Sequence, residues 1–194
     1  MQKAVNVFLC LIIAGLIFGC GTGRETTPVN ITPESDGSTT WTSSFGVGSV
    51  KIHRSFKYVG VEDKSDSKAN RFYHVWKRPS GEIIYIVDFS SRTGWNFPED
   101  YDGGLGSSQN PKEKGIVYHR PLRYTVWNSI NKKSYAALDD LDVKIPECKF
   151  TIQTARFSPS RKSAYIFTMF QERKCDDENF DQLLDDTRAW VKLL

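Results

Sequence analysis

The first twenty residues constrain this chain most, because their composition does not suit a water-soluble domain. The start Met1–Lys3 is short and positive, and residues 4–18 form an apolar run that only Asn6 and Gly15 interrupt. A run of about 15 residues is shorter than the roughly 18 to 20 that a resident transmembrane helix needs. A positive start followed by a short apolar run is typical of a secretory signal peptide, so we expect the protein to be exported.

The apolar run ends in the sequence Ile17-Phe18-Gly19-Cys20. This sequence resembles the lipobox of bacterial lipoprotein precursors, although Phe18 is bulkier than the residue usual at its place. The resemblance implies that residues 1–19 are a signal peptide and that Cys20 becomes the lipidated first residue of the mature protein. It also implies a partner, the lipid membrane, to which more than one acyl chain gives durable attachment. Gly21, rather than Asp, resembles the outer-membrane default of cells with two membranes.

Two alternatives to the lipobox remain open. One is an ordinary secretory signal that is cleaved near this position, and the other is an uncleaved N-terminal anchor. In both alternatives Cys20 carries no lipid.

A polar segment follows the leader. Sixteen of the 24 residues from Gly21 to Ser44 are Gly, Ser, Thr or Pro, and the only large apolar ones are Val29, Ile31 and Trp41. Such a composition offers little apolar surface to bury against the entropy of ordering. We therefore expect residues 20–44 to be the lipidated cysteine and a flexible tether, with a single globular domain over residues 45–194. The alternative is that Thr39–Ser44 pairs as an edge strand.

The composition of the whole chain is that of a globular protein. It has 194 residues, of which 39% are hydrophobic and 25% charged, and its formal net charge is +3. This hydrophobicity is too high for general disorder, and so small a charge does not suit nucleic-acid binding. A domain of about 150 residues buries enough surface to fold without a metal.

The cysteines support export. Cys10 lies in the leader and Cys20 is assigned to lipid, which leaves Cys148 and Cys175 as a pair. In an oxidising compartment a single pair indicates a disulfide. The β-prone segments 149–157 and 163–173, with a turn sequence between them, would bring the two sulfurs to the open end of one hairpin.

The sequence pattern of the domain predicts mainly strands, followed by a C-terminal helix. We expect strands over 47–61, 72–77, 82–90 and 115–128, a short element over 133–141, and a C-terminal helix with apolar residues at Phe180, Leu183, Leu184, Thr187, Val191 and Leu194. The fold class is therefore α+β: a mainly antiparallel β-sheet with one C-terminal amphipathic helix packed on it. This order of elements resembles the PsbP/Mog1-type fold of some bacterial lipoproteins, and a β-sandwich or small barrel with a trailing helix is the alternative.

Reactive motifs are scarce. His53, His74 and His119 lie far apart on expected strands, without metal-ligand spacing, so we expect no metal and no catalytic residue. Nucleotide-binding loops and hydrolase elbows are missing from the sequence, which predicts no cofactor.

The segment 91–114 stands apart because it lacks a strand or helix pattern and is long for a loop. It carries the candidate binding residues Trp95, Phe97, Asp100, Tyr101 and Asp102. Aromatic rings beside carboxylates suit a ligand, but the simpler interpretation is that these aromatic residues pack back onto the sheet.

These features predict a membrane-anchored lipoprotein of the bacterial cell envelope that acts as a non-catalytic binding or assembly module. Its partner would be an envelope protein, a glycan or a small molecule. One alternative is an envelope hydrolase that uses His119 or His74 with a carboxylate such as Asp100. The other is a carrier of a small apolar ligand held between sheet and helix.

Overall fold

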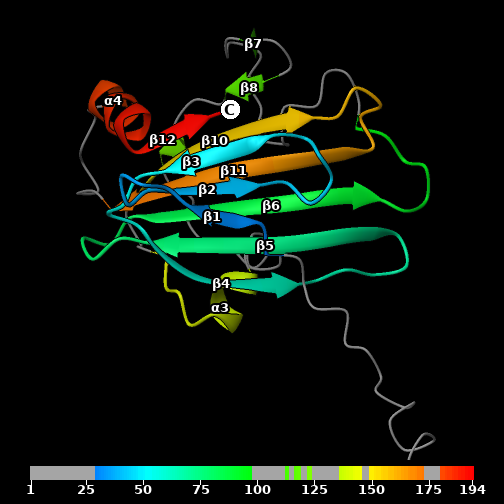
Figure 1. Cartoon of the computed structure of the whole chain (residues 1–194), viewed down its shortest axis with the longest axis horizontal. Coiled ribbons are helices and arrows are strands. Elements are labelled where there is room, and N and C mark those ends of the chain that lie inside the picture. The colour runs from blue at the N-terminus through cyan, green and yellow to red at the C-terminus, as the bar shows by residue number, and fades with distance from the viewer. Residues whose placement is uncertain are drawn as a thin grey trace, which may run out of the picture.

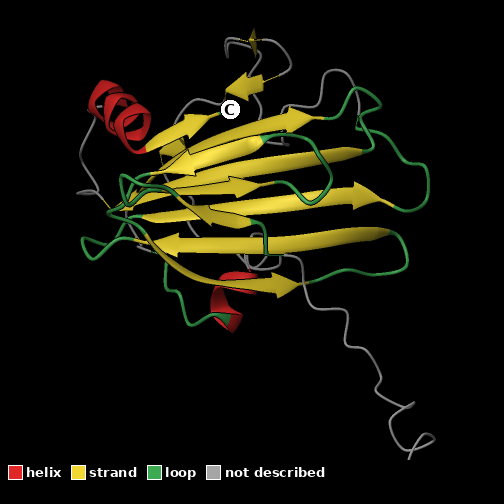
Figure 2. Ribbon diagram, viewed as in Figure 1, coloured by secondary structure: helices red, strands yellow, loops and turns green. Residues whose placement is uncertain are grey.

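Two antiparallel sheets make up most of the described chain (Figures 1 and 2). The computed structural model describes residues 29–97, 112–113, 116–118, 122–123, 136–145, 149–172 and 180–194. The small sheet has the order β1-β2-β3-β12, from strands β1 (Ile31–Pro33), β2 (Thr39–Thr42), β3 (Ser49–Ile52) and β12 (Val191–Leu193). The large sheet has the order β4-β5-β6-β11-β10-β8-β7, with β9 also paired to β10. Its strands are β4 (Lys57–Asp63), β5 (Ala69–Lys77), β6 (Ile83–Ser91), β7 (Lys112–Glu113), β8 (Ile116–Tyr118), β9 (Leu122–Arg123), β10 (Lys149–Phe157) and β11 (Ser163–Glu172).

Helices are few and short in the described part of the chain. They are α3 (Ala136–Asp140) and α4 (Phe180–Trp190). The expectation of a mainly antiparallel fold is confirmed, because every described strand pairing is antiparallel.

Two predicted hairpins form the centre of the large sheet. Strands β5 and β6 pair from Ala69↔Ser91 to Lys77↔Ile83, and β10 and β11 pair from Lys149↔Glu172 to Phe157↔Ala164. Residues 83–86 are all buried. This burial explains why that part of β6 is continuously apolar: it is covered on both faces.

The predicted tether over residues 20–44 is wrong in its second half. Residues 31–33 and 39–42 form β1 and β2, and the Trp41 side chain is 0% exposed. The threonines of β2 alternate with this tryptophan, so a strand that looks polar in composition still places one large ring in the core. The ordered domain therefore begins before residue 45, and the alternative of a strand near Thr39 was the better one.

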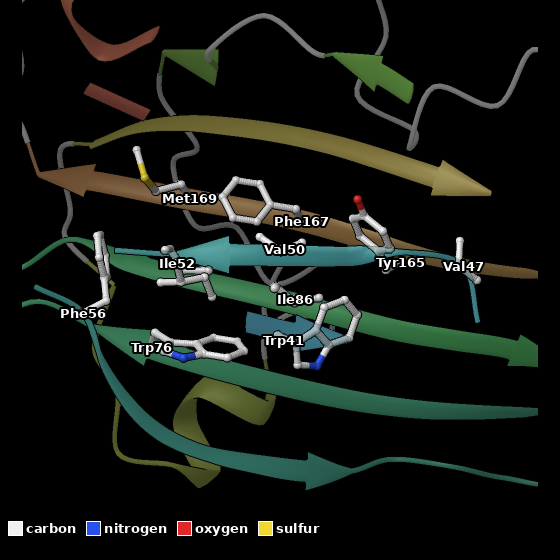
Figure 3. Packing of buried hydrophobic residues seen from close by; sticks show 11 residues of the cluster. Trp41, Val47, Val50, Ile52, Phe56, Trp76, Ile86, Tyr165, Phe167 and Met169 are labelled. Carbon is white, nitrogen blue, oxygen red and sulfur yellow. The ribbon is translucent and has the colours of Figure 1, made fainter. Parts of the chain in front are cut away.

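The interior between the two sheets is filled with large apolar side chains. Figure 3 shows Trp41, Val50 and Ile52 from the small sheet facing Trp76, Ile86 and Phe167 from the large one. We call this cluster the inter-sheet core; its other members are Val47, Phe56, Ile84, Tyr165 and Met169. Burial of each such side chain contributes about 1.5 to 3 kcal/mol, so this layer is a main source of stability.

The opposite face of the large sheet is partly covered by α3. Its buried residues Ala137 and Leu138, with Val143 beyond, pack against Val75 and Tyr85. We call this cluster the α3 core; its remaining buried members are Ile83 and Phe170. Side chains alternate along a strand, which is why β5 and β6 supply both cores.

Two predicted elements have different bounds from those expected. The stretch 47–61 is broken by a turn at His53–Phe56, so that β3 lies in the small sheet and β4 in the large one. The C-terminal helix ends at Trp190, because residues 191–193 leave it to pair with β3.

Candidate functional site

The segment after β6, predicted to be a binding loop, begins by packing against the sheet. Phe97 is 5% exposed, and its backbone N–H donates to the Arg161 carbonyl at 2.8 Å. The Arg161 Nε returns a hydrogen bond to the Phe97 carbonyl at 2.7 Å. The Phe97 ring lies 5.1 Å from that of Phe89 and 5.0 Å from that of Phe157. Phe97 is therefore part of the packed domain rather than a ligand contact.

Trp95 differs from Phe97, because it is 49% exposed while its ring lies 4.7 Å from the Phe97 ring. The indole of Trp95 therefore packs on Phe97 with one side, which fixes its position, and exposes the other side to solvent. The other predicted binding residues, Asp100, Tyr101 and Asp102, lie outside the described residues.

Three loops meet at the end of the sandwich where β6 finishes. The Ser91 N–H donates to the Lys162 carbonyl at 2.9 Å, and the Arg92 N–H donates to the Lys68 carbonyl at 2.8 Å. The chain enters the domain at this same end, since the Asn30 side chain lies 3.3 Å from the Ser44 hydroxyl and Ser44 binds β6. We call this the Asn30 end; it comprises residues 43–48, 64–68, 92–97 and 158–162.

His74 lies inside the inter-sheet core and not in a cleft. Its side chain is 0% exposed, its Nδ1 lies 3.3 Å from the Tyr58 hydroxyl, and its ring packs edge-on against Trp41 at 5.5 Å. Its Nε2 has no hydrogen-bond partner among the described residues. Burial lowers the pKa of His74 to about 4, so the ring is neutral at physiological pH.

Asp88 is the second titratable group in this interior. It is 0% exposed, and its carboxylate accepts hydrogen bonds from the Ser43 hydroxyl at 2.7 Å and the Ser44 N–H at 2.6 Å. Burial raises the pKa of Asp88 to about 6, although the hydrogen bonds from Ser43 and Ser44 act in the opposite direction. The contacts attach the turn after β2 to the large sheet.

The register places His74 and Asp88 diagonally on neighbouring strands. Phe72 pairs with Asp88 and His74 pairs with Ile86, so the two titratable side chains project from the same face of the sheet. The Asp88 carboxylate accepts from Ser43 and Ser44, while the His74 Nδ1 lies near the Tyr58 hydroxyl and its Nε2 has no partner among the described residues. The arrangement therefore holds two separate buried groups rather than a histidine–carboxylate dyad.

This geometry does not fit a hydrolase built on His74, because a general base must reach a substrate from solvent. The other histidine of that hypothesis, His119, lies outside the described residues. Among the described residues, no group of three or more His, Cys, Asp or Glu side chains is placed to hold a metal ion. None of the described helices has the length and apolarity required to cross a bilayer.

The predicted lipidation and disulfide residues are not described. Cys20, Cys148 and Cys175 all lie outside the described residues. The hairpin between the last two is confirmed, with Lys149 opposite Glu172 at its open end. Lipidation and the disulfide both stay predictions.

Asp88 was missed by the sequence analysis. It is a single carboxylate after the apolar run Ile83–Val87, and alternation along the strand places it on the same face as Ile84 and Ile86. That alternation was a usable signal for a buried carboxylate.

The chain has no match in the comparisons with known proteins. No family model, no curated protein and no solved structure is significantly similar to it.

Proposed function

We propose that this protein is a lipid-anchored module of the bacterial cell envelope that binds a partner and performs no catalysis. The observation that carries the proposal is the leader ending in Ile17-Phe18-Gly19-Cys20, followed after ten intervening residues by a folded β-sandwich that starts at Ile31. Cleavage before Cys20 and acylation of its sulfur would hold the sandwich at a membrane surface.

The linker between anchor and domain is shorter than the sequence alone predicts. Strand β1 begins at Ile31, so only residues 21–30 separate Cys20 from the sheet. A flexible chain of that length has a typical reach of roughly 16 to 19 Å. The domain would then work close to the lipid headgroups.

The two alternative functions have less support. The described interior between the sheets is filled by buried side chains such as Trp41, Trp76 and Phe167, whereas a carrier needs space there for an apolar ligand. A hydrolase based on His74 conflicts with the burial of that side chain.

The C-terminal helix contributes to closing the domain in this proposal. Trp190 packs on Phe56 at 5.9 Å, and the Thr187 hydroxyl lies 3.9 Å from the Met169 sulfur. These contacts support the proposal that the C-terminal half of α4 lies against the sheets.

The anchor is tested by metabolic labelling with an alkyne analogue of palmitate. We expect label on the wild-type protein and on Cys10→Ala, and loss of label together with release from membranes in Cys20→Ala. Cys10→Ala is a matched control because it removes a thiol from the same leader. A purified protein whose N-terminal peptide starts upstream of Cys20, or carries it unmodified, would overturn the proposal.

The disulfide is a separate part of the proposal. The hairpin register supports it, because Cys148 directly precedes β10 and Cys175 follows shortly after the end of β11. We expect thiol blocking and mass measurement to find both cysteines protected until reduction. Closing a loop of this length contributes roughly 3 to 4 kcal/mol. Two thiols that react without reduction would remove the bond.

A further inference from the structure

The Asn30 end of the sandwich carries an exposed aromatic ring among basic side chains. Lys68, Arg92 and Lys162 are exposed there, Arg161 is half-buried, and Trp95 is 49% exposed. The backbone hydrogen bonds between the three loops hold these residues on one surface. We call these five residues the cationic tip.

The charge of the described loops differs between the two ends of the sandwich. The loops at the Asn30 end contain five basic residues and one acidic residue: Lys64, Lys68, Arg92, Arg161 and Lys162 against Asp66. At the opposite end, the loops 34–38, 53–56 and 78–82 contain two basic and three acidic residues: Arg54 and Arg78 against Glu34, Asp36 and Glu82. Among these described loops, the excess of positive charge therefore lies at the Asn30 end of the sandwich.

Two ion pairs and the C-terminus refine this picture. Asp66 pairs with Arg71 at 2.8 Å, which compensates the one acidic charge in these loops, and Lys64 pairs with Asp140 at 2.5 Å. Leu194 also lies toward the Asn30 end, where Arg156 donates a hydrogen bond to its main-chain oxygen. Arg161 is turned inward, toward the Phe97 carbonyl and the Phe157 ring. The exposed positive charge of the cationic tip therefore belongs to Lys68, Arg92 and Lys162, of which Arg92 also donates to the Asp66 carbonyl at 3.0 Å and to the Asn70 side chain.

The place where the chain enters the domain indicates that the partner of the cationic tip is a membrane. Asn30 lies at the same end as the cationic tip, and the proposed linker from Cys20 is only ten residues long. An anchored domain therefore has this end, rather than the opposite one, near the lipid. Tryptophan is enriched at the headgroup level of membranes, and each Lys or Arg near an anionic surface strengthens binding by about fivefold.

We propose that the cationic tip is a docking surface for an anionic lipid bilayer. Trp95 enters the headgroup layer, and Lys68, Arg92 and Lys162 contact lipid phosphates. The Asn30 end of the domain then contacts the membrane, and the opposite end faces away from it and is accessible to partners. The proximity argument rests on the proposed lipid anchor, whereas the charge and the exposed ring do not.

The test uses the full chain purified from membranes and reconstituted into vesicles that contain a doxyl-labelled lipid quencher near the headgroups. Trp41 and Trp76 are 0% exposed, so quenching of fluorescence reports mainly on more accessible rings such as Trp95. The vesicles are either pure phosphatidylcholine or contain about 30% phosphatidylglycerol.

The matched variants are two double charge reversals. Lys68→Glu/Lys162→Glu changes the tip, and Lys57→Glu/Lys77→Glu changes two exposed lysines that pair across β4 and β5 at the opposite end. Trp95→Phe identifies the reporting ring.

We expect quenching in anionic vesicles that is several-fold stronger than in neutral ones for the wild type and for Lys57→Glu/Lys77→Glu. Lys68→Glu/Lys162→Glu and Trp95→Phe should each lose the difference, and high salt should weaken it. Equal quenching in both vesicle types, or equal losses in both double variants, would overturn the proposal.

Failure of the anchor is distinguishable from failure of the tip. The mass of the N-terminal peptide reports on acylation of Cys20 alone. If that sulfur is bare, the same protein added to preformed vesicles still tests the tip, because charge-dependent quenching does not require the anchor.

Discussion

The two faces of the large sheet are packed in different ways. The face toward the small sheet buries His74 among aromatic rings and Asp88 beside Ser43 and Ser44, whereas the α3 core contains no histidine or carboxylate among its described members. His74 and Val75 are neighbours in sequence, yet alternation along β5 places one in each core. Between pH 4 and pH 6.5, the pH response of the described core should therefore come from the face toward the small sheet.

The two faces also differ in the kind of contact that attaches the neighbouring layer to the large sheet. Asp88 connects the turn after β2 to the large sheet through two hydrogen bonds, so the small sheet is held by polar contacts as well as by apolar packing. The α3 core relies on packing of residues such as Leu138 and Tyr85.

Replacing Trp41 by Ala should destabilise the domain most. This ring is 0% exposed and contacts both His74 and Tyr165 at 5.5 Å, so its loss leaves a large cavity between the sheets. We expect the free energy of unfolding in urea to fall by about 3 to 5 kcal/mol. Trp95→Ala, which removes an exposed ring, is the control and should cost far less. Equal losses would mean that β2 does not cover the core.

Replacing Leu138 by Ala should have the next largest effect. This side chain is 1% exposed and packs in the α3 core, and a Leu→Ala change there costs about 2 to 4 kcal/mol. Hydrogen exchange should quicken in α3 more than in β2 and β3, because the small sheet lies on the other face. Uniform quickening would show that the two cores unfold as one unit.

The two buried titratable groups should give opposite pH dependences. The pKa of Asp88 is raised to about 6, so its contribution to stability is fully present below its ordinary value of 3.8 and is lost as the pH rises through about 6. The pKa of His74 is lowered to about 4, so its contribution is present above its ordinary value of 6.5 and is lost as the pH falls through about 4. Each shift corresponds to about 3 kcal/mol at most.

Single variants separate these opposing contributions. Between pH 6.5 and pH 4, acidification should lower the Tm of Asp88→Asn more steeply than that of the wild type. It should instead raise the Tm of His74→Phe relative to the wild type, and the double variant should restore a shallow profile. Parallel profiles for all four proteins would contradict the assignment of the pH response to the inter-sheet core.

A surface ion pair should have the smallest effect. Lys51 and Asp36 lie 2.8 Å apart on the exposed side of the small sheet, and their contact holds the pKa of Asp36 well below its usual range. Solvent and salt screen such a pair, so Lys51→Ala should leave the Tm unchanged within measurement error. A clear loss that disappears at high salt would show that the small sheet depends on surface charge.

The hairpins of the large sheet were predictable because local signals and the tertiary fold agree. Arg78-Pro79-Ser80-Gly81 and Ser158-Pro159-Ser160-Arg161 are turn sequences between β-rich segments, and both close hairpins in the structure. The antiparallel class followed from these local patterns.

Other parts depended on contacts distant in sequence. Strand β2 has one large apolar residue, Trp41, and forms because that ring meets residues of β5 and β11. Residues 191–193 continue the helical spacing of α4 but pair with β3 instead. For both strands, tertiary packing overrides local propensity. Alternation along β6 indicated a buried position for Asp88, but its hydrogen-bond partners Ser43 and Ser44 lie far away in sequence and could not be predicted.

The pairing of β12 with β3 has a consequence for how the molecule is made. The small sheet joins strands from the two extremes of the domain, with Val191 opposite Ile52. Non-local pairing of this kind forms slowly, and it waits for the last strand to be synthesised. Until then the outer edge of β3 offers unpaired backbone groups to any neighbouring chain. A chaperone that protects the newly made chain would therefore need to cover the edge of β3 until β12 pairs with it.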